Sequence, residues 1–267
     1  MTTLAQRKGS SQLKKITALL CAAAMIALSG CSYSGSSYNV MHEYDFSEME
    51  LVQLQPPQEG DTIAIFDTTM GEIRTVLYPQ YAPYTVKGFM DKAESGYYNG
   101  MEIFGIIDDI YFLSGYTVDE KGNYLGRESD DELIANECNV NLWPFKGALL
   151  SFSEKAGYSD ARFFICNEEE ITEDAINELK ASAAERENEA ERENLLDLFG
   201  KFEEIGGVFG AAGTYTVFGQ TYEGLDVIEA ICATPVDKDN RPVNEIIINS
   251  VTITEYTENE DTTNEAQ

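Results

Sequence analysis

Short runs of alternating apolar and polar residues recur along the chain between residues 61 and 255. The segment DTIAIFDTTMGEIRTVLY alternates on both sides of a Thr-Met-Gly break, which predicts a β-hairpin. Many short strands with few helices favour a closed barrel over a doubly wound sheet. Further strands are predicted at 102–107, 110–115, 147–153, 162–166, 214–219 and 246–254.

Two segments carry helix signals and are expected to pack on this sheet. In APYTVKGFMDKAESG, Pro83 stands near the start, apolar residues recur at helical spacing, and Gly96 stands at the end. The segment EGLDVIEAI, residues 223–231, fits a second helix. The predicted fold is therefore mainly β.

One acidic segment departs from the β pattern. Residues 168–204 contain no glycine or proline before Gly200 and are rich in residues that favour helices. Apolar residues gather at the two ends of the segment, whereas the middle, residues 182–194, is polar. This distribution predicts a helical insertion that packs at both ends and is solvated in between.

The first 31 residues resemble the export signal of a bacterial lipoprotein. A basic region, residues 7–15, precedes the apolar run ITALLCAAAMIAL, which is short for a membrane span. The run closes with LSGC, whose Cys31 stands where such signals carry the lipidated cysteine. We therefore expect residues 1–30 to be removed and Cys31 to anchor the protein in the cell membrane, at its extracytoplasmic face. An uncleaved anchor and an ordinary signal peptide are the alternatives.

The segments that flank the β-rich part have the composition of linkers. Residues 31–59 begin rich in Ser, Gly and Tyr and end near a Pro-Pro pair, so we expect a flexible tether. Residues 257–267 form a polar, acidic tail. Between them, residues 60–256 form a single predicted domain, and we expect a monomer.

The charge of the chain excludes one class of partner. Eighteen basic and 47 acidic residues give a formal net charge of −29. A chain that starts at Cys31 loses four basic residues and no acidic one, and would carry 14 − 47 = −33. Such a surface repels nucleic acid, so DNA or RNA binding is not expected.

Few residues offer metal or nucleophilic chemistry. Apart from Cys31, the chain after the signal contains Cys138, Cys166 and Cys232, at no spacing typical of metal ligands. They stand beside apolar sequence, and buried thiols are the expected result. The single histidine, His42, lies in the tether. We expect no metal and no cofactor, and no mechanism that needs a histidine base inside the domain.

Several stretches, taken in order, resemble one known family. GEIRTVLYPQYAPYTVKGFMDKAESGYYNG looks like an opening hairpin, first helix and Tyr-Tyr-x-Gly turn, and KGALLSFS and ARFFI look like two central strands. GTYTVFGQTYEGLDVIEAI matches a Val-Phe-Gly strand and its following helix, and NRPVNEIIINSVTI a closing strand. Together they resemble the cyclophilin family of peptidyl-prolyl isomerases. The resemblance implies a closed eight-stranded antiparallel barrel capped by two helices, here with the acidic insertion added.

The resemblance also implies a reaction, the rotation about the bond before a proline in a peptide. This rotation needs no metal, cofactor or covalent intermediate. In the family, an arginine on the third strand is the main donor and a glutamine positions the substrate backbone. Counting from the turn at residues 97–100, the arginine position is Gly105 and the strand's glutamine position is Leu113. In ARFFI, Arg162 stands at a glutamine position.

The pocket positions keep more of the family's character. Phe164 keeps the phenylalanine of the pocket floor, and Phe104 stands beside the arginine position. Phe152 or Ser151 occupies the position of a pocket methionine, since the loop length leaves this position ambiguous by one residue. The remaining positions carry other residues than the family: Gly210 for a tryptophan or histidine, Ala211 for a leucine, and Tyr215 for a histidine.

Three functions remain open at this point. The first is an extracytoplasmic foldase that acts on X-Pro bonds of secreted chains with weak or relocated catalysis, in which Arg162 supplies the missing guanidinium. The second is a non-catalytic module that binds proline-containing peptides or an extracytoplasmic protein, with Arg162 in a salt bridge. The third is a scaffold whose acidic helix carries the function. The residues at 105, 113 and 210 favour the second function over the first.

Overall fold

A hairpin of β1 (Thr62–Thr68) and β2 (Gly71–Leu77) opens the folded part of the chain, as the alternating pattern predicts. The computed structural model describes residues 44–107, 109–116 and 133–258. Gly71 in the turn has a φ of 135°, and a Cβ there would lie 2.7 Å from Cγ2 of Val227. Glycine is therefore required at this turn, both for its backbone and for the close approach of the later helix.

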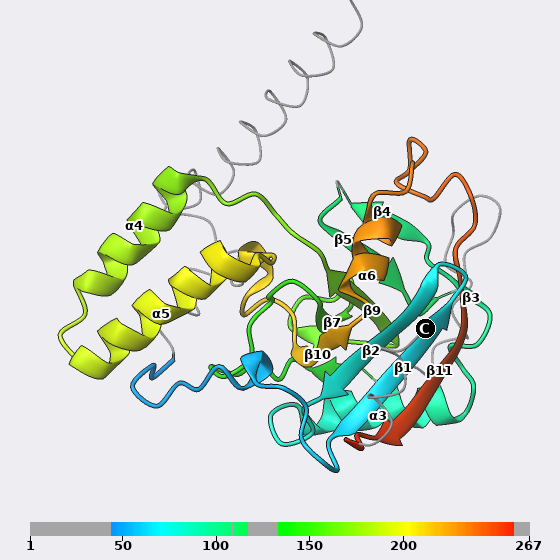
Figure 1. The fold of residues 1–267 in the computed structure, drawn as a ribbon, viewed down its shortest axis with the longest axis horizontal. Coiled ribbons are helices and arrows are strands. Elements are labelled where there is room, and N and C mark those ends of the chain that lie inside the picture. Colours follow the sequence, from blue (N-terminus) through cyan, green and yellow to red (C-terminus); the bar gives the residue numbers. More distant parts are fainter. Residues whose placement is uncertain (1–43, 108, 117–132, 259–267) are drawn as a thin grey trace, which may run out of the picture.

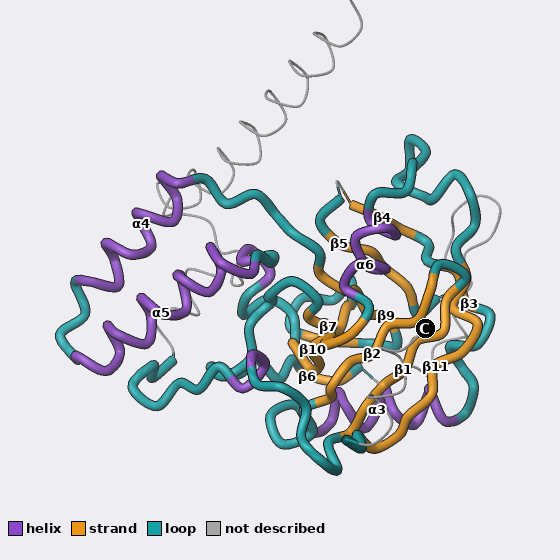
Figure 2. The backbone as a smooth tube through the Cα atoms, in the orientation of Figure 1, coloured by secondary structure: helices purple, strands orange, loops and turns teal. Residues whose placement is uncertain are grey.

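The strands form one curled antiparallel sheet (Figures 1 and 2). Its hydrogen-bonded order is β3-β11-β1-β2-β10-β7-β9-β5-β4. A separate pair joins β6 (Ile134–Ala135) to β8 (Tyr158–Ser159). The further strands of the large sheet are β3 (Met101–Glu102), β4 (Gly105–Ile107), β5 (Tyr111–Ser114), β7 (Ala148–Phe152), β9 (Arg162–Cys166), β10 (Val217–Glu223) and β11 (Ile247–Glu255).

The strand expected at 102–107 is split in two, and the split lies where the sheet meets itself. β3 pairs with β11 at one edge and β4 pairs with β5 at the other. Between them, the Ile103 N–H donates to the Ile246 carbonyl (2.9 Å) and the Phe104 N–H donates to the Leu113 carbonyl (3.1 Å). The chain therefore passes from one edge of the sheet to the other within two residues. The mainly β, antiparallel class is confirmed, whereas a closed ring of paired strands is not seen among the described residues.

The two predicted helices are α3 (Pro83–Glu94) and α6 (Leu225–Cys232), at opposite ends of the curled sheet (Figure 1). Both bury apolar side chains in the same core. Phe89 of α3 lies at the centre of its aromatic part, with ring centroids 5.3 to 5.9 Å from those of Phe66, Phe163 and Phe218. The apolar faces of the helices thus fill the inside of the sheet.

The acidic insertion forms two helices, α4 (Glu173–Ala184) and α5 (Glu189–Ile205), which we call the helical hairpin. Each helix starts at a residue whose side chain caps backbone N–H groups, Thr172 for α4 and Asn188 for α5. The turn falls within the stretch that was predicted to be polar. The hairpin extends away from the sheet (Figure 1). Its buried residues, which include Leu198, Phe199 and Phe202, pack with Trp143 and Phe145 in a core of their own.

The second half of the predicted tether packs against the domain. Phe46 is fully buried, with its ring centroid 6.2 Å from that of Trp143. Asn194 of α5 donates to the Phe46 carbonyl (2.7 Å). This segment, residues 44–54, ends in the short helix η1 (Val52–Leu54), and we call it the strap. It differs from the expected flexible linker because its apolar residues find a hydrophobic surface that the helical hairpin provides.

Residues 1–43 and 259–267 lie outside the described part of the chain, and with them Cys31, the predicted signal, the first part of the tether and most of the predicted tail. Within the described part, no helix combines the length and the apolar character needed to cross a bilayer.

Candidate active site

Gly105 and Leu113, which the sequence resemblance assigns to the positions of the family's arginine and glutamine, face each other across the β4–β5 pairing. Leu113 is 8% exposed, and a Cβ on Gly105 would lie 3.3 Å from its Cδ1. Neither side chain has a polar hydrogen to donate. The place where the family holds its catalytic donor is therefore apolar in this chain.

Five of the predicted pocket residues lie in one apolar cluster, together with Leu113 at the predicted glutamine position. Four members of the cluster are buried, and two are half-buried against them, so that the group borders on solvent. We call this group the site cluster. Its buried members are Phe104, Leu113, Phe164 and Ala211, and its half-buried members are Phe152 and Tyr215.

Aromatic rings cover the predicted pocket floor. The Phe164 ring is 2% exposed. Its centroid lies 5.0 Å from that of Tyr111, 5.2 Å from Tyr215 and 6.5 Å from Phe152. Phe152 and Tyr215 are themselves stacked, with centroids 5.8 Å apart. Because Phe164 is almost fully buried among side chains, a proline ring can contact it only if a neighbouring side chain moves.

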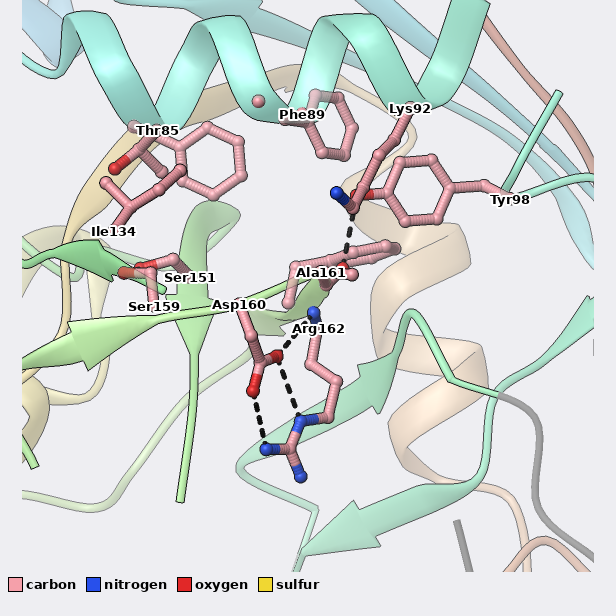
Figure 3. A pocket seen from close by; sticks show the side chains of 13 residues that line it. Thr85, Phe89, Lys92, Tyr98, Ile134, Ser151, Ser159, Asp160, Ala161 and Arg162 are labelled. Atoms are coloured by element: carbon pink, nitrogen blue, oxygen red, sulfur yellow. Dashed lines mark hydrogen bonds and ion pairs between the residues drawn. The ribbon is translucent and has the colours of Figure 1, made fainter. Parts of the chain in front are cut away.

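Arg162 lies at the start of β9, beside the site cluster, with its guanidinium turned to the carboxylate of Asp160 (Figure 3). Its Nε and Nη2 donate to the two carboxylate oxygens of Asp160 at 3.0 and 2.7 Å. Its Nη1 donates to Glu154 at 3.2 Å. Burial works to lower the pKa of Arg162, but the hydrogen bonds and charges of Asp160 and Glu154 outweigh it and raise the pKa. The guanidinium is held as a cation in a bidentate pair.

Two rings also flank the Arg162 guanidinium. Its carbon lies 4.8 Å from the Tyr116 ring centroid and 4.9 Å from the Phe152 ring centroid. The Arg162 side chain is 5% exposed, and its guanidinium is paired with Asp160. This arrangement fits a structural salt bridge better than a donor that replaces the family's arginine. Its role as a donor stays a prediction.

Two small cavities lie near these residues, and both are smaller than a proline ring. The first, of about 20 Å³, lies between α3 and β9 and is lined among others by Thr85, Ser159 and Arg162 (Figure 3). The second, of about 10 Å³, is lined by Tyr215, Cys138 and part of the strap. Volumes of this order hold one water molecule. Neither cavity could be predicted from the sequence, because each is made by segments far apart in the chain.

Gly210 and Ala211 lie on the short helix η2 (Phe209–Ala211), which connects the helical hairpin to the site cluster. Phe209 packs in the hairpin core, whereas Ala211 belongs to the site cluster. A Cβ on Gly210 would find one atom within 4 Å, an oxygen of the Glu169 carboxylate at 3.9 Å. Glu169 was not singled out from the sequence, where it is one of three consecutive glutamates.

None of the three cysteines in the described residues offers a reactive thiolate. Burial raises the pKa of Cys138 to about 11 and is the main cause that raises the pKa of Cys232 to about 12. Cys166 is fully buried, and its pKa is raised in the same direction. In the part of the chain that the structure describes, no three metal-ligating residues gather in one place.

Comparisons with known proteins agree with this geometry. The family model of cyclophilin type peptidyl-prolyl cis-trans isomerases matches residues 63–253. A putative peptidyl-prolyl cis-trans isomerase of Staphylococcus aureus (strain USA300) is 26% identical over 199 residues, which cover 74% of this chain and 94% of that protein. A putative peptidyl-prolyl cis-trans isomerase of Staphylococcus saprophyticus is 29% identical over 205 residues, 76% of this chain and 98% of that protein.

Solved structures share the fold. A cyclophilin type peptidyl-prolyl cis-trans isomerase of Cryptosporidium parvum matches with a TM-score of 0.52 and 18% identity, over 74% of this chain and 99% of that one. The same protein crystallised in the presence of the dipeptide Ala-Pro matches with a TM-score of 0.51. The curled sheet, the two packing helices and the family match over residues 63–253 lead to one conclusion: this chain belongs to the cyclophilin-type peptidyl-prolyl cis-trans isomerase family.

Proposed function

We propose that this protein is a membrane-anchored, extracytoplasmic member of its family that binds proline-containing segments of secreted chains, and that its isomerase activity is weak or lost. The observation that carries the second part is the pairing of Gly105 with Leu113. A donor that acts on the twisted amide is worth on the order of 10²–10³ in rate. Two side chains without donors occupy the positions where the family keeps this function.

The site cluster supports the binding part of the proposal. Half-buried Phe152 and Tyr215 present aromatic surface beside a buried apolar floor, which suits an apolar ring such as that of proline. The Cryptosporidium protein that shares the fold was crystallised in the presence of the dipeptide Ala-Pro. The uncatalysed barrier to rotation of about 18–20 kcal/mol leaves room for a small acceleration by an apolar site alone.

The alternative is a non-catalytic module that binds an extracytoplasmic protein rather than isolated X-Pro segments. The rings that cover Phe164 favour this alternative, because they fill the space where a proline ring would enter. The paired state of Arg162 favours it as well. A partner protein can contact the rim of the site cluster without opening it.

The proposed location depends on the N-terminal region of the sequence. Support comes from the order of basic residues, apolar run and LSGC before the domain. Cys31 lies 13 residues before Tyr44, where the strap begins. Fully extended, these residues reach about 45 Å at 3.3–3.6 Å each, so the domain would stay near the membrane surface. We expect the Cys31→Ser variant to move from the membrane to the soluble fraction of the expressing cells, and unchanged fractionation would contradict the anchor.

Isomerisation and binding are tested on one set of samples. Exchange NMR on a blocked Ala-Pro peptide measures its cis–trans rate, and shift changes on titration measure its binding. We expect binding with a rate at least about 10²-fold below that of a family member that keeps the arginine and glutamine. A comparable rate that collapses in the Arg162→Ala variant, with its fold retained by circular dichroism, would instead make Arg162 the donor. Absence of peptide binding would favour the protein-binding alternative.

A further inference from the structure

The carboxylate of Glu169 stands half-buried and without a counter-ion at the edge of the site cluster. In the described residues, its side chain makes no hydrogen bond and no ion pair. Lys146, a nearby cation, pairs with Glu168 and Glu229 instead. Burial raises the pKa of Glu169, as expected for an anion that lacks a partner.

The helical insertion holds this carboxylate in place. The Glu169 N–H donates to the Gly207 carbonyl (3.0 Å), which joins the segment before α4 to the segment after α5. Gly207 also forms a β-bridge with Phe145. The base of the helical hairpin is thus fixed to the domain, and Glu169 is fixed with it rather than carried on a free loop.

Open space lies beside this carboxylate, at the position where the family has a large ring. Gly210 has no positive φ, so its backbone does not require glycine. The single neighbour within 4 Å of a Cβ there is the Glu169 oxygen. The next residue, Ala211, is part of the site cluster. Glu169 also contributes, after burial and Cys232, to the raised pKa of Cys166, another buried member of that apolar region.

We propose that Glu169 is a specificity-determining residue, which accepts the ammonium or guanidinium group of a lysine or arginine that flanks the proline of a bound peptide. The ligand class is then a basic X-Pro segment. This inference rests on the proposed peptide binding and adds a preference to it. A cation at this place gains a charge-assisted hydrogen bond in a half-buried setting, where such a bond is stronger than in water. A glutamate in the same position of the peptide is repelled.

Three blocked peptides of the form X-Ala-Pro-X, with lysine, glutamine or glutamate as X, test this assignment at physiological salt. We expect the lysine peptide to bind the wild type about tenfold more tightly than the glutamine peptide, and the glutamate peptide to bind most weakly. In Glu169→Gln, the preference for lysine should fall to about twofold or less, while the affinity for the glutamine peptide stays the same.

The acidic surface of the whole protein also attracts lysine, and a matched control separates that effect. Glu178→Gln removes the same charge from an exposed position on α4 and should keep the tenfold preference. A preference that survives in Glu169→Gln, or falls equally in both variants, would overturn the assignment of Glu169 while peptide binding stands. If none of the three peptides binds the wild type, the proposed peptide binding falls, and this inference falls with it.

Discussion

Gln53 and Trp143 are held together by two hydrogen bonds between the side-chain amide of Gln53 and the backbone of Trp143. The Trp143 N–H donates to Oε1 of Gln53, and Nε2 of Gln53 donates to the Trp143 carbonyl at 2.8 Å. The same Nε2 lies 3.0 Å from Oε1 of Gln220 on β10. Gln53 is 4% exposed, so these bonds are shielded from water. One side chain of the strap thereby fixes the strap to both the sheet and the loop that carries Trp143.

Gln53→Ala should therefore destabilise the protein by about 3 kcal/mol. The change leaves the Trp143 N–H and Oε1 of Gln220 without the partner that Gln53 supplied, and each such buried group costs about 1–3 kcal/mol. Chemical denaturation measures the free energy of unfolding. Hydrogen exchange should also show faster opening of α5, because Phe46 of the strap packs against the hairpin core.

Gln58→Ala is the matched control for this change. Gln58 lies in the same N-terminal region, but it is exposed, and its side chain donates to the carbonyls of the neighbouring Pro56 and Pro57. We expect a change below about 0.5 kcal/mol. Equal effects of the two substitutions would show that the strap contributes nothing through Gln53.

Gly105→Arg together with Leu113→Gln should raise the isomerisation rate if the lost donors are what limits the reaction. Both backbones lie in ordinary strand conformation, so the new side chains are compatible with it. A Cβ at 105 needs Leu113 to shift by a few tenths of an ångström, which the second substitution helps to provide. We expect a gain of roughly 10–10²-fold in exchange NMR with an Ala-Pro peptide.

Gly105→Lys together with Leu113→Gln is the control for this gain. Lysine supplies a positive charge without the planar fork of arginine, and should restore less of the rate. If the folded Arg/Gln variant shows no gain in rate, the missing donors do not limit isomerisation. The rings that cover Phe164 would then be what limits it.

Arg162→Met should lower stability much more than it lowers peptide binding. The side chains of Arg162 and Asp160 are each 5% exposed, and removal of one partner of a buried pair costs about 3–5 kcal/mol. Glu154→Gln should cost less than about 1 kcal/mol, because the Glu154 side chain is 67% exposed. Thermal unfolding with a parallel peptide titration distinguishes the two roles. Loss of peptide binding without loss of stability would show that Arg162 contacts the ligand.

Much of this fold could be predicted from local sequence patterns, because the conformational preferences of neighbouring residues determine where many turns and helices begin. The turn at Gly71 and the start of α3 at Pro83 follow from backbone preferences of single residues. The family resemblance and residue counting singled out Gly105 and Leu113. The pairing of β4 with β5 then places the two residues opposite each other.

Other features depend on contacts between distant segments, which no local pattern contains. The partner of Gln53 lies 90 residues further along the chain. The sequence around Gln53 therefore predicted a flexible linker. Glu169 lies beside Gly210 because both ends of the helical insertion return to the same place. The break between β3 and β4 at Ile103 and Phe104 arises because the two N–H groups donate to different neighbouring segments.

Glu102 on β3 gives the fold a pH dependence that can be measured. Burial is the main cause that raises the pKa of Glu102, a hydrogen bond and the charge of Glu245 add to it, and Arg241 opposes it. A carboxyl whose pKa is higher in the folded than in the unfolded state keeps its proton longer when folded. The free energy of unfolding therefore falls as the pH rises through the pKa of the folded state. That pKa lies above the usual glutamate value of about 4.3.

Glu102→Gln removes this titration and should remove the corresponding loss of stability. At a pH below the unfolded pKa, the wild type and the variant should differ little, because the carboxyl is neutral in both states. Toward neutral pH, the variant should become the more stable of the two. Denaturation curves at several pH values measure the difference, with Glu94→Gln as the exposed control. A wild type that gains stability relative to Glu102→Gln as the pH rises would mean that Arg241, not Glu245, dominates the surroundings of this carboxyl.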